Sequence, residues 1–401
     1  MRILFVADGR SPIARGWISS VLALGHEVHV VSTYRCDPWP SLASLTVVPV
    51  AFSGLKSGDA GAGGLGGARQ RAQLRHWLGP LTVPLAARSL RLRLATLKPD
   101  LVHALRVPFE GMMAAWAGPA VPLVVSIWGN DFSLHAAGSP LMSRLTRRTM
   151  ANAAGVHADC QRDVRLAHRW GLKLEKPTVV LPGNGGVAPP FLAPDPVSGL
   201  ESGSQVSELL SSRLDGEQPL VCNPRGLRAY VRNDVFFKSI PLVLAERPDV
   251  RFACPMMVGS RRAESWVARL SIESSVSLLG RLNAVEMAAL LARSQVMVSP
   301  SEHDGTPNSL LEAMACGAFP VAGDLESLRE WIDDGENGLL IDPSDPQALA
   351  KAILAALADP AWRRRAAAAN RRLIETRAAR QRVQEQVERF YQEVVAFGGT
   401  G

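Results

Sequence analysis

Two acidic residues eight positions apart, Asp304 and Glu312, flank a loop that leads into a predicted helix. Free backbone N–H groups at the start of a helix favour an anion, and phosphate is the usual one. Glu312 lies about one turn inside this helix, where its carboxylate can accept hydrogen bonds from two neighbouring hydroxyls, such as a ribose diol. The spacing therefore predicts a site for a phosphate beside a diol. The alternative interpretation is one more strand–helix unit that carries a glutamate on its surface.

The elements that would position these two acids follow from the local pattern. The apolar run 296–298 is short enough to be a buried strand. Glycine, proline, asparagine and serine within 305–309 break any regular pattern and predict a loop. Residues 310–315 are strong helix formers, and Gly317 is well placed to end the helix. The predicted order is strand, tight loop and helix.

This stretch resembles the nucleotide-sugar signature of the family 4 glycosyltransferases, which are retaining enzymes of the GT-B fold. The family pattern is usually Glu-x7-Glu, so Asp304 stands as a shortened first acid, and Leu311 to Gly317 match closely. The resemblance also covers the N-terminal strand–helix–strand unit and most of the chain, and it is weak between residues 50 and 95. It implies an α/β fold with two facing Rossmann-like, doubly wound domains and an interdomain cleft.

A run of cations follows another predicted strand, 220–222, where the chain reads Asn-Pro-Arg-Gly-Leu-Arg-Ala-Tyr-Val-Arg. A leaving diphosphate must be neutralised, and the sequence contains neither an Asp-x-Asp motif nor a His/Cys cluster at ligand spacing. Cations and helix N-termini are therefore expected to do this without a metal or other cofactor. The family places an arginine and, about five residues later, a lysine here. Arg225 resembles the arginine, while Arg228 or Arg232 could replace the lysine, and a plain surface charge stays open for Arg228.

The resemblance implies donor-site roles for the residues of both stretches. Glu312 would bind the ribose, the amides from Asn308 to Leu310 the diphosphate, and Asp304 hydroxyls of the transferred sugar. Backbone after another predicted strand, 276–279, would pass near the base. The predicted donor-binding residues are Arg225, Arg228, Arg232, Gly280, Arg281, Leu282, Asp304, Gly305, Thr306, Asn308, Ser309, Leu310 and Glu312.

A second group of polar residues follows the predicted strands of the first half, where a parallel sheet would bind an acceptor. In the resembled family, the loop after the first strand faces the donor diphosphate and the acceptor. The predicted acceptor-side residues are Gly9, Arg10, Ser11, His103, Trp128, Asp131 and His135. A structural hydrogen bond is the alternative role for His103.

One departure from the family lies on this acceptor side. Many relatives carry a histidine beside the reacting carbon, and this sequence has Trp128 at that position. Retaining enzymes of this kind are thought to use the donor's own phosphate to take the acceptor proton, so that no protein base is obligatory. Trp128 could then stack against a sugar. The residues predicted to take part in catalysis are Arg225, Asp304 and Asp131.

The order of predicted elements gives two successive α/β halves. The predicted domains are an N-terminal acceptor domain, 1–188, and a C-terminal donor domain, 220–378. Residues 189–219 are rich in proline, serine and glycine and predict an interdomain linker with one short helix near 206–210. Residues 379–401 are expected to form a terminal helix that packs back toward the first domain, as the resemblance implies.

Composition sets the remaining expectations. The chain has 401 residues and a formal net charge of +7 from 44 basic and 37 acidic residues, with the arginines scattered. No stripe indicates nucleic-acid binding, no apolar run is long enough to span a bilayer, and five cysteines without paired spacing suit a reduced compartment. The expected location is cytoplasmic, with peripheral contact to the inner face of the membrane as a further expectation.

Two features between residues 60 and 95 need separate interpretations. Gly61, Gly63 and Gly66 match the dinucleotide-binding glycine pattern, but no strand precedes them closely, and a glycine-rich loop explains them better. Arginines and leucines then alternate over 69–94. Such a surface could dock on anionic lipid, or it could be a solvated helical face.

The sequence thus predicts a metal-independent, retaining glycosyltransferase. Its donor would be a nucleotide-diphosphate sugar, with UDP or GDP favoured, and its acceptor a saccharide or a lipid-linked saccharide. The alternatives are a non-catalytic nucleotide-sugar-binding protein of the same fold and a nucleotide-sugar epimerase.

Overall fold

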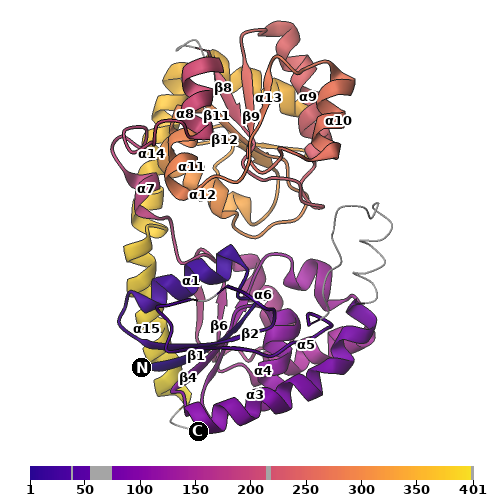
Figure 1. Ribbon diagram of the computed structural model, residues 1–401, viewed down its shortest axis with the longest axis vertical. Helices are drawn as coiled ribbons and strands as arrows, with labels where there is room; N and C mark the ends of the chain where they lie inside the picture. The colour runs from indigo at the N-terminus through magenta and orange to yellow at the C-terminus, as the bar shows by residue number, and fades with distance from the viewer. Residues whose placement is uncertain (38, 55–74, 214–217, 399–401) are drawn as a thin grey trace. The chain divides into compact units, whose positions relative to one another are not determined.

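The computed structural model describes residues 1–37, 39–54, 75–213 and 218–398 (Figure 1). The chain forms two compact units. The first comprises Met1–Gly186 together with Val383–Gly401, and the second comprises Val187–Arg382. The predicted α/β class with two parallel, doubly wound sheets is confirmed. Gly61, Gly63 and Gly66, with the basic residues before 75, lie outside the described residues.

Within the described residues of the first unit, seven parallel strands pair in the order β3-β2-β1-β4-β5-β6-β7. The strands are β1 (Arg2–Ala7), β2 (Glu27–Ser32), β3 (Ser44–Val47), β4 (Leu101–Ala104), β5 (Leu123–Ile127), β6 (Gly155–Ala158) and β7 (Thr178–Val180). The helical segments are α1 (Pro12–Leu22), η1 (Gly79–Thr82), α3 (Val83–Leu97), η2 (Val107–Gly111), α4 (Met112–Ala117), η3 (Asp131–Ala136), α5 (Pro140–Asn152) and α6 (Gln161–Arg169). Because all strands are parallel, the loops after β1, β4 and β5 meet at one edge of the sheet.

Alternation along the central strand β1 fills two cores, one on each face of the sheet. Ile3 and Phe5 pack with side chains of α1, whereas Leu4 and Val6 pack with α3, α4 and α5. A strand that is buried on both faces reads as a continuous apolar run, which is how β1 appears in the sequence.

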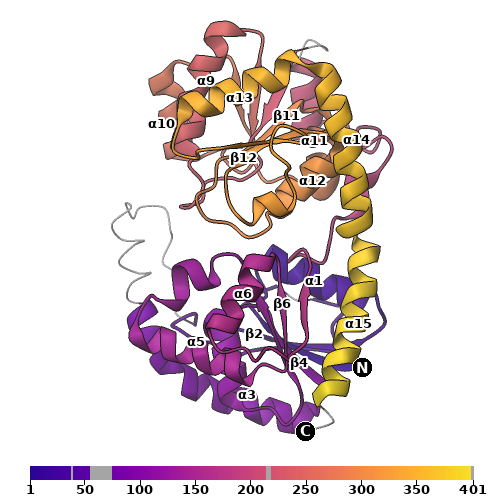
Figure 2. The same cartoon turned by 180° about the vertical axis from the view of Figure 1, so that it is seen from behind.

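Helix α15 (Arg380–Gly398) covers part of the first of these two faces (Figure 2). Its residues from Val383 onward belong to the first unit. Val383, Val387 and Phe390 are buried in the same cluster as Ile3 and Phe5, at the spacing of one helical face. The C-terminal helix therefore packs on the N-terminal sheet.

Within the described residues of the second unit, six parallel strands pair in the order β10-β9-β8-β11-β12-β13. The strands are β8 (Leu220–Cys222), β9 (Arg251–Cys254), β10 (Val276–Leu278), β11 (Val296–Ser299), β12 (Phe319–Gly323) and β13 (Leu339–Ile341). The helical segments are α7 (Pro189–Leu192), α8 (Gln205–Glu208), η4 (Leu209–Arg213), α9 (Asn233–Glu246), α10 (Arg261–Leu270), α11 (Ala284–Arg293), α12 (Asn308–Cys316), η5 (Leu328–Glu330), α13 (Pro346–Ala358) and α14 (Pro360–Arg377). A capping box of Asn283 and Glu286 begins α11.

The segment predicted to be a linker, 189–219, differs from that prediction in its described part. Phe191, Val206 and Leu209 are buried in one core of the second unit, beside α11 and α12. The segment therefore belongs to the second unit, which begins at Val187. Its few apolar anchors are separated by proline, serine and glycine, so that no periodic pattern indicated burial. Residues 214–217 lie outside the described residues.

The alanine- and arginine-rich sequence after Pro360 forms two helices, α14 and α15, with a short interruption between them. Backbone bonds to another segment accompany the interruption: the Val187 amide donates to the Ala378 carbonyl at 2.8 Å, and the Arg380 amide donates to the Val187 carbonyl at 3.1 Å. The break lies at residues without a proline or glycine signal, which explains why the sequence did not indicate it. Within the described residues, no helix combines the length and apolar character needed to cross a bilayer.

Candidate functional site

The predicted strand, loop and helix around Asp304 and Glu312 are present as β11 and α12. β11 pairs on both sides, with β8 and β12, and is fully buried. Helix α12 begins after Pro307, which has no side chain that could cap the helix, and it ends at Gly317 with a φ of +86°. That conformation favours glycine. Among the described residues, no side chain therefore caps the first amides of α12.

The amides available at this helix start are fewer than predicted. The Leu310 N–H donates to the Pro307 carbonyl at 3.0 Å, and the Leu310 side chain is wholly buried in the core. Leu310 is thus a packing residue, and its predicted diphosphate contact would require this bond to break. The amides of Asn308 and Ser309 are the ones that remain for an anion.

An arginine from the loop after β8 joins the two halves of the predicted donor site. The Arg225 guanidinium donates to Asp304 Oδ2 at 2.5 Å and to Ser309 Oγ at 3.2 Å. Its backbone amide is held by Asn223 Oδ1 at 3.2 Å. Arg225 and Asp304 are both buried, and Arg225 Nε has no hydrogen-bond partner in the described part of the chain. Three predicted site residues therefore meet in one network.

Burial and charge act against each other on the two acids. Burial raises the pKa of Asp304, and the Arg225 guanidinium offsets part of that rise. Burial also raises the pKa of Glu312 from 4.5 to about 7, with Arg225 and Arg380 pulling it down. Arg380 begins α15 and was not among the predicted site residues, because a charge 68 positions away along the sequence carries no local signal. Because burial disfavours the ionised form of Glu312, hydroxyl groups that donate hydrogen bonds to its carboxylate would stabilise that form.

The structure separates the two candidates for the missing lysine. Arg232 forms a pair of bonds of 2.9 Å to the Asp234 carboxylate and one of 2.6 Å to Glu302 Oε1. Two carboxylates, those of Asp234 and Glu302, therefore already neutralise the Arg232 charge. Arg228 is exposed and donates through Nε to the Arg225 carbonyl at 3.2 Å, and its charge helps to lower the pKa of Asp304. Arg228 is the better placed of the two to meet a diphosphate.

Three residues that the sequence did not single out hold the Asp304 loop. The Ser327 hydroxyl donates to the Asp304 carbonyl at 2.9 Å, and Trp331 Nε1 donates to the buried hydroxyl of Thr306 at 3.1 Å. Gly323 lies so close to Ser301 that a Cβ there would come within 2.3 Å of its carbonyl oxygen. These contacts fix the loop that contains Gly305 from the β12 side.

The backbone predicted to pass near the base is already engaged. The Gly280 amide donates to Gln205 Oε1 at 2.7 Å, and a Cβ at Gly280 would lie 2.9 Å from Gln205 Nε2. Gln205 belongs to α8, in the segment predicted to be a linker, and was missed for that reason. Arg281 is exposed, while Leu282 packs against the core. A nucleotide base that bound at this loop would have to share the Gly280 N–H with Gln205 Oε1.

The first unit contains a cavity of about 440 Å³ at the edge where β1, β4 and β5 end. Four of the predicted acceptor-side residues line it, namely Arg10, Ser11, Trp128 and His135. Its full lining is Asp8, Arg10, Ser11, Tyr34, Arg75, His76, Leu105, Arg106, Pro108, Phe109, Glu110, Trp128 and His135. Several of these were missed because the sequence between 50 and 95 has no readable pattern and because η2 is irregular.

Three predicted acceptor-side residues do not line this cavity. Asp131, also predicted to be catalytic, is buried and accepts from Arg106 Nε at 2.9 Å and from the amides of Val107 at 3.0 Å and Trp128 at 3.3 Å. Through these bonds Asp131 holds the segments around Val107 and Trp128 in place. His103 is wholly buried between Tyr391 Oη at 2.7 Å and Ser126 Oγ at 2.8 Å, so it has the alternative, structural role.

Gly9 is the third, and its contribution is also structural. Its amide donates to Ser32 Oγ at 3.0 Å, and a Cβ at this position would lie 2.6 Å from Cys36 Sγ. Only a residue without a side chain lets the loop after β1 pass so close to its neighbour.

One group of metal-ligating side chains occurs in the described residues, formed by Asp159, Cys160 and Asp163. All three are buried, and their ligand atoms lie within 4.8 Å of one another. Arg162 Nε donates to Asp163 Oδ1 at 2.9 Å, and burial raises the pKa of the Cys160 thiol. A protonated thiol and an acid already paired with arginine are poor metal ligands. This trio includes none of the predicted site residues.

Comparison with known proteins identifies two domains. Residues 225–359 match the family described as "Glycosyl transferases group 1", and residues 9–183 match "Glycosyl transferase 4-like domain".

Among curated proteins, a GDP-mannose-dependent monoacylated alpha-(1-6)-phosphatidylinositol monomannoside mannosyltransferase of Corynebacterium glutamicum is 32% identical over 165 residues, 39% of this chain and 42% of that protein. The phosphatidyl-myo-inositol mannosyltransferase of Mycobacterium tuberculosis is 29% identical over 170 residues, 41% of this chain and 44% of that protein. The chain thus spans less than half the length of these relatives.

Solved structures share the fold along the whole chain. Sucrose-phosphate synthase from Thermosynechococcus elongatus superposes with a TM-score of 0.74 at 18% identity and covers 99% of both chains. HepE from Anabaena in complex with UDP superposes with a TM-score of 0.71 at 17% identity, over 98% of this chain and 100% of that one. At these identities the likeness shows the fold alone.

Proposed function

We infer that this chain, which belongs to the family 4 glycosyltransferases, transfers a sugar from a nucleotide-diphosphate donor to a saccharide or lipid-linked saccharide acceptor, with retention of the anomeric configuration. The observation that carries the proposal is the network of Arg225, Asp304 and Ser309 beside the uncapped start of α12, with Glu312 one turn further. It combines cations, free amides and a carboxylate, which are the groups that a nucleotide diphosphate needs.

In the proposed donor complex, the diphosphate lies at the amides of Asn308 and Ser309 and takes hydrogen bonds from Arg225 and Arg228. As the glycosidic bond breaks, negative charge grows on the leaving diphosphate, and fixed donors stabilise that charge without reorganisation. Glu312 accepts from the ribose diol. Asp304, held by Arg225, accepts from a hydroxyl of the transferred sugar and orients it.

Retention follows from the donor's own phosphate taking the acceptor proton on the face where the sugar leaves. Among the described residues that line the first unit's cavity, Asp8 is paired with Arg10, and Glu110 bonds the Thr33 hydroxyl at 2.6 Å. Neither is poised as a general base. Proton nuclear magnetic resonance of the product tests this step: an inverted anomeric configuration would contradict it.

The donor base is proposed to be uracil or guanine. One relative's name specifies GDP-mannose, and the HepE complex contains UDP. Metal independence is also proposed, on the support of two arginines and two free amides at the diphosphate position.

Arg228 is expected to matter more for the donor than Arg232. Because a charge-assisted hydrogen bond contributes about 1.5–3 kcal/mol, Arg228→Ala should weaken nucleoside diphosphate binding by about tenfold or more. Arg232→Ala should leave that affinity nearly unchanged and lower the melting temperature, since Asp234 and Glu302 lose their partner. Calorimetric titration of both variants with UDP and GDP measures the difference. Equal losses of affinity would contradict the assignment.

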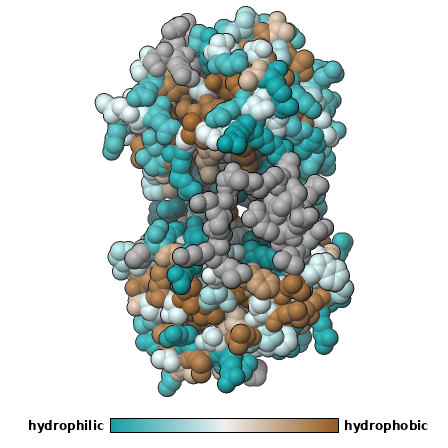
Figure 3. Space-filling model, turned by 45° about the vertical axis from the view of Figure 1, so that its right-hand side comes forward, coloured by the Kyte–Doolittle hydropathy of each residue, from teal (hydrophilic) through white to brown (hydrophobic). Residues whose placement is uncertain are grey.

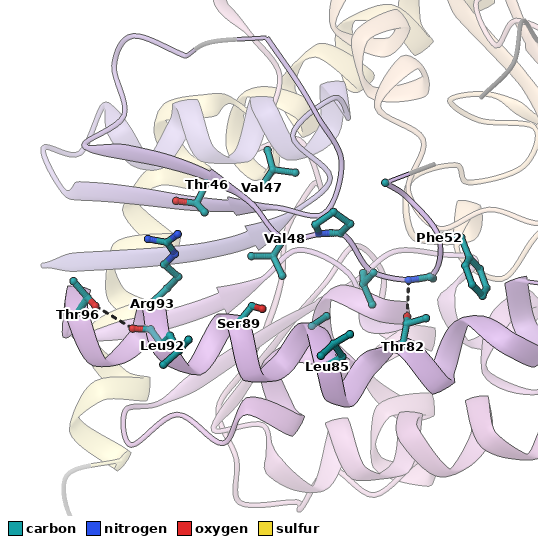
Figure 4. Close-up of a pocket in the computed structure, with 15 residues that line it drawn as sticks. Thr46, Val47, Val48, Phe52, Thr82, Leu85, Ser89, Leu92, Arg93 and Thr96 are labelled. Atoms are coloured by element: carbon teal, nitrogen blue, oxygen red, sulfur yellow. Dashed lines mark hydrogen bonds between the residues drawn. The ribbon is translucent and has the colours of Figure 1, made fainter. Parts of the chain in front are cut away.

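A lipid-linked acceptor is supported by an apolar face on the first unit. Leu81, Leu85 and Leu92 on η1 and α3 are 64%, 74% and 67% exposed. Figure 4 shows Leu85, Leu92 and Arg93 at a pocket of about 800 Å³ between α3 and the edge strand β3. Figure 3 shows hydrophobic residues gathered on the surface of the first unit, among hydrophilic ones. We propose that this face contacts an anionic bilayer, with the exposed arginines near the lipid phosphates.

Replacing Leu85 and Leu92 together by glutamate should reduce binding to phosphatidylglycerol-containing vesicles by at least about tenfold, because two apolar anchors are lost and two negative charges are added. Vesicle sedimentation measures this. Leu174→Glu changes a leucine that is even more exposed but lies outside η1 and α3, and this variant should bind as the wild type does. If the double variant still sediments with the vesicles, the face is only a solvated surface.

A further inference from the structure

We propose that the 440 Å³ cavity of the first unit binds a phosphate ester through Arg75, Arg106 and the neighbouring histidines. The inference rests on the proposed function and deepens it, since the phosphate would belong to the acceptor. The resemblance directs the loop of Arg10 and Ser11 toward the donor diphosphate and the acceptor, but it gives no role to Arg75, His76 or Arg106, which were not among the predicted site residues.

Charge is the first argument. Arg10 is matched by Asp8, through bonds of 3.0 and 2.9 Å, and its guanidinium stacks over Tyr34 at 3.5 Å. Arg106 donates through Nε to Asp131 at 2.9 Å. Arg75 has no carboxylate partner among the described residues, and its guanidinium lies 4.7 Å from the centre of the Phe109 ring. Among the described residues of the lining, Arg75 is therefore the arginine without a carboxylate hydrogen-bonded to it, and the nearby acid on which its charge acts is Glu110.

Two buried N–H groups of the cavity residues are available as hydrogen-bond donors. Arg75 Nε and Trp128 Nε1 are both buried and have no hydrogen-bond partner in the part of the chain that the structure describes. Leaving a buried N–H without an acceptor is unfavourable. Both residues line the same cavity, and a phosphate oxygen could accept from either.

A histidine pair adds a third donor. His76 Nε2 and His135 Nδ1 are 3.0 Å apart, so one ring donates to the other. Burial and the nearby arginines lower the pKa of both, that of His135 to about 3, and the pair is neutral at pH 7. Each neutral ring carries one N–H. One of the two N–H groups forms the hydrogen bond between the rings, and the other lies on an outer nitrogen, either His76 Nδ1 or His135 Nε2. Whichever carries it can donate.

The remaining acid of the cavity does not oppose this assignment. Burial raises the pKa of Glu110, and this outweighs the opposite effects of the Thr33 hydroxyl, which donates to the carboxylate at 2.6 Å, and of the Arg106 and Arg75 charges. A carboxyl that is drawn toward its neutral form repels an anion weakly. Asp8 is bound to Arg10, as described above.

The backbone around Arg106 is held in a costly conformation. Arg106 has a φ of +145° and Phe109 has a φ of +68°, and both line the cavity. Such conformations are strained for residues with a side chain and persist where surrounding contacts impose them. Asp131 supplies two of these contacts, one to the Arg106 side chain and one to the Val107 amide. The buried acid thus positions Arg106 at the cavity.

The test uses the full chain with glycerol 3-phosphate and, separately, vesicles of phosphatidylcholine with and without phosphatidylinositol. We expect glycerol 3-phosphate to bind the wild type, and Arg75→Ala to weaken it about tenfold or more, the effect of one charge-assisted contact. Arg75→Lys should recover part of the loss. Binding of the soluble ester alone would assign the phosphate to a soluble acceptor, and additional Arg75-dependent binding of phosphatidylinositol vesicles would assign it to a lipid headgroup.

Two controls separate this proposal from folding and from the donor site. Arg75→Ala should bind UDP or GDP as the wild type does, which shows that it is folded. Glu312→Ala should lose the nucleotide and retain glycerol 3-phosphate. If no nucleotide binds while the ester does, the proposed function fails and the anion site stands. If the wild type and Arg75→Ala bind the ester equally, or neither binds it, the anion site is overturned.

Discussion

Glu312→Gln is expected to weaken nucleotide-sugar binding by at least about thirtyfold, because two ribose hydroxyls lose a charged acceptor worth about 1.5–3 kcal/mol for each bond. The same variant should stabilise the unliganded protein at pH 8. Burial holds the pKa of Glu312 at about 7 in the folded chain, above its ordinary 4.5. A functional carboxylate is thus kept where ionisation is costly, as at many binding sites.

The sign of the stability effect follows from the direction of the shift. A carboxyl whose pKa is raised by folding contributes its full stability below pH 4.5, and that contribution is lost as the pH rises through about 7. Glutamine does not ionise and avoids the loss, which is at most about 3 kcal/mol. The melting temperature of Glu312→Gln should therefore exceed that of the wild type at pH 8, and the difference should shrink toward pH 5.

Thermal melts at the two pH values, with calorimetric titration of UDP and GDP, test both halves of this prediction. Glu336→Gln is the matched control, since Glu336 is an exposed acid of the same unit and should change neither quantity. A Glu312→Gln variant that binds nucleotide normally would exclude the ribose role. One that is less stable at pH 8 would show that the carboxylate is well stabilised in the empty site.

Arg225→Ala is expected to lower kcat/KM by about 100-fold or more, since a fixed donor to the leaving diphosphate is removed. It should also destabilise the fold by about 3–5 kcal/mol, because the buried Asp304 carboxylate loses its ion pair with Arg225. Loss of the guanidinium raises the pKa of Asp304 further, so the destabilisation should be smaller in acid than at neutral pH.

A double variant separates the two effects of Arg225. Arg225→Ala with Asp304→Asn removes the unpaired charge and should regain most of the stability at pH 7 but none of the activity. Arg225→Lys should not restore activity, because an ammonium group does not reproduce the planar pair of bonds to Asp304 and Ser309. Urea unfolding and nucleotide-release kinetics measure the two quantities. Full activity in the double variant would remove Arg225 from the mechanism.

Local pattern was sufficient to predict the β11–loop–α12 segment, because an apolar run, loop formers and helix formers follow one another there. It was not sufficient for the ion pair of Arg225 and Asp304, which are 79 positions apart. Only the pairing of β8 with β11 brings their loops together. Arg225 was predicted to contact the diphosphate and Asp304 to bind hydroxyls of the transferred sugar, but their ion pair was not predicted.

The residues that the sequence missed have a common physical reason. Arg380, Gln205 and Ser327 belong to segments that carry no motif. Gln205 and Ser327 each make one hydrogen bond to a loop of the donor site, and the charge of Arg380 lowers the pKa of Glu312. Asp131 was predicted at the acceptor side, and His103 either there or in a structural hydrogen bond; both side chains form buried hydrogen bonds. Polar residues at strand ends are typical of binding sites. The buried hydrogen bonds of His103 to the Tyr391 side chain, and of Asp131 to the Val107 backbone amide, are not visible in the local sequence pattern.

Calorimetric titration of UDP and GDP into the wild-type protein, in the presence of EDTA, tests the central claim most directly. The account predicts that one of the two binds with one-to-one stoichiometry without a metal, and that Glu312→Ala abolishes the heat. If neither nucleotide binds, the donor site at α12 is contradicted. If binding appears only when a divalent metal replaces EDTA, the arginines and amides are not sufficient for the diphosphate, and the metal-independent mechanism is contradicted.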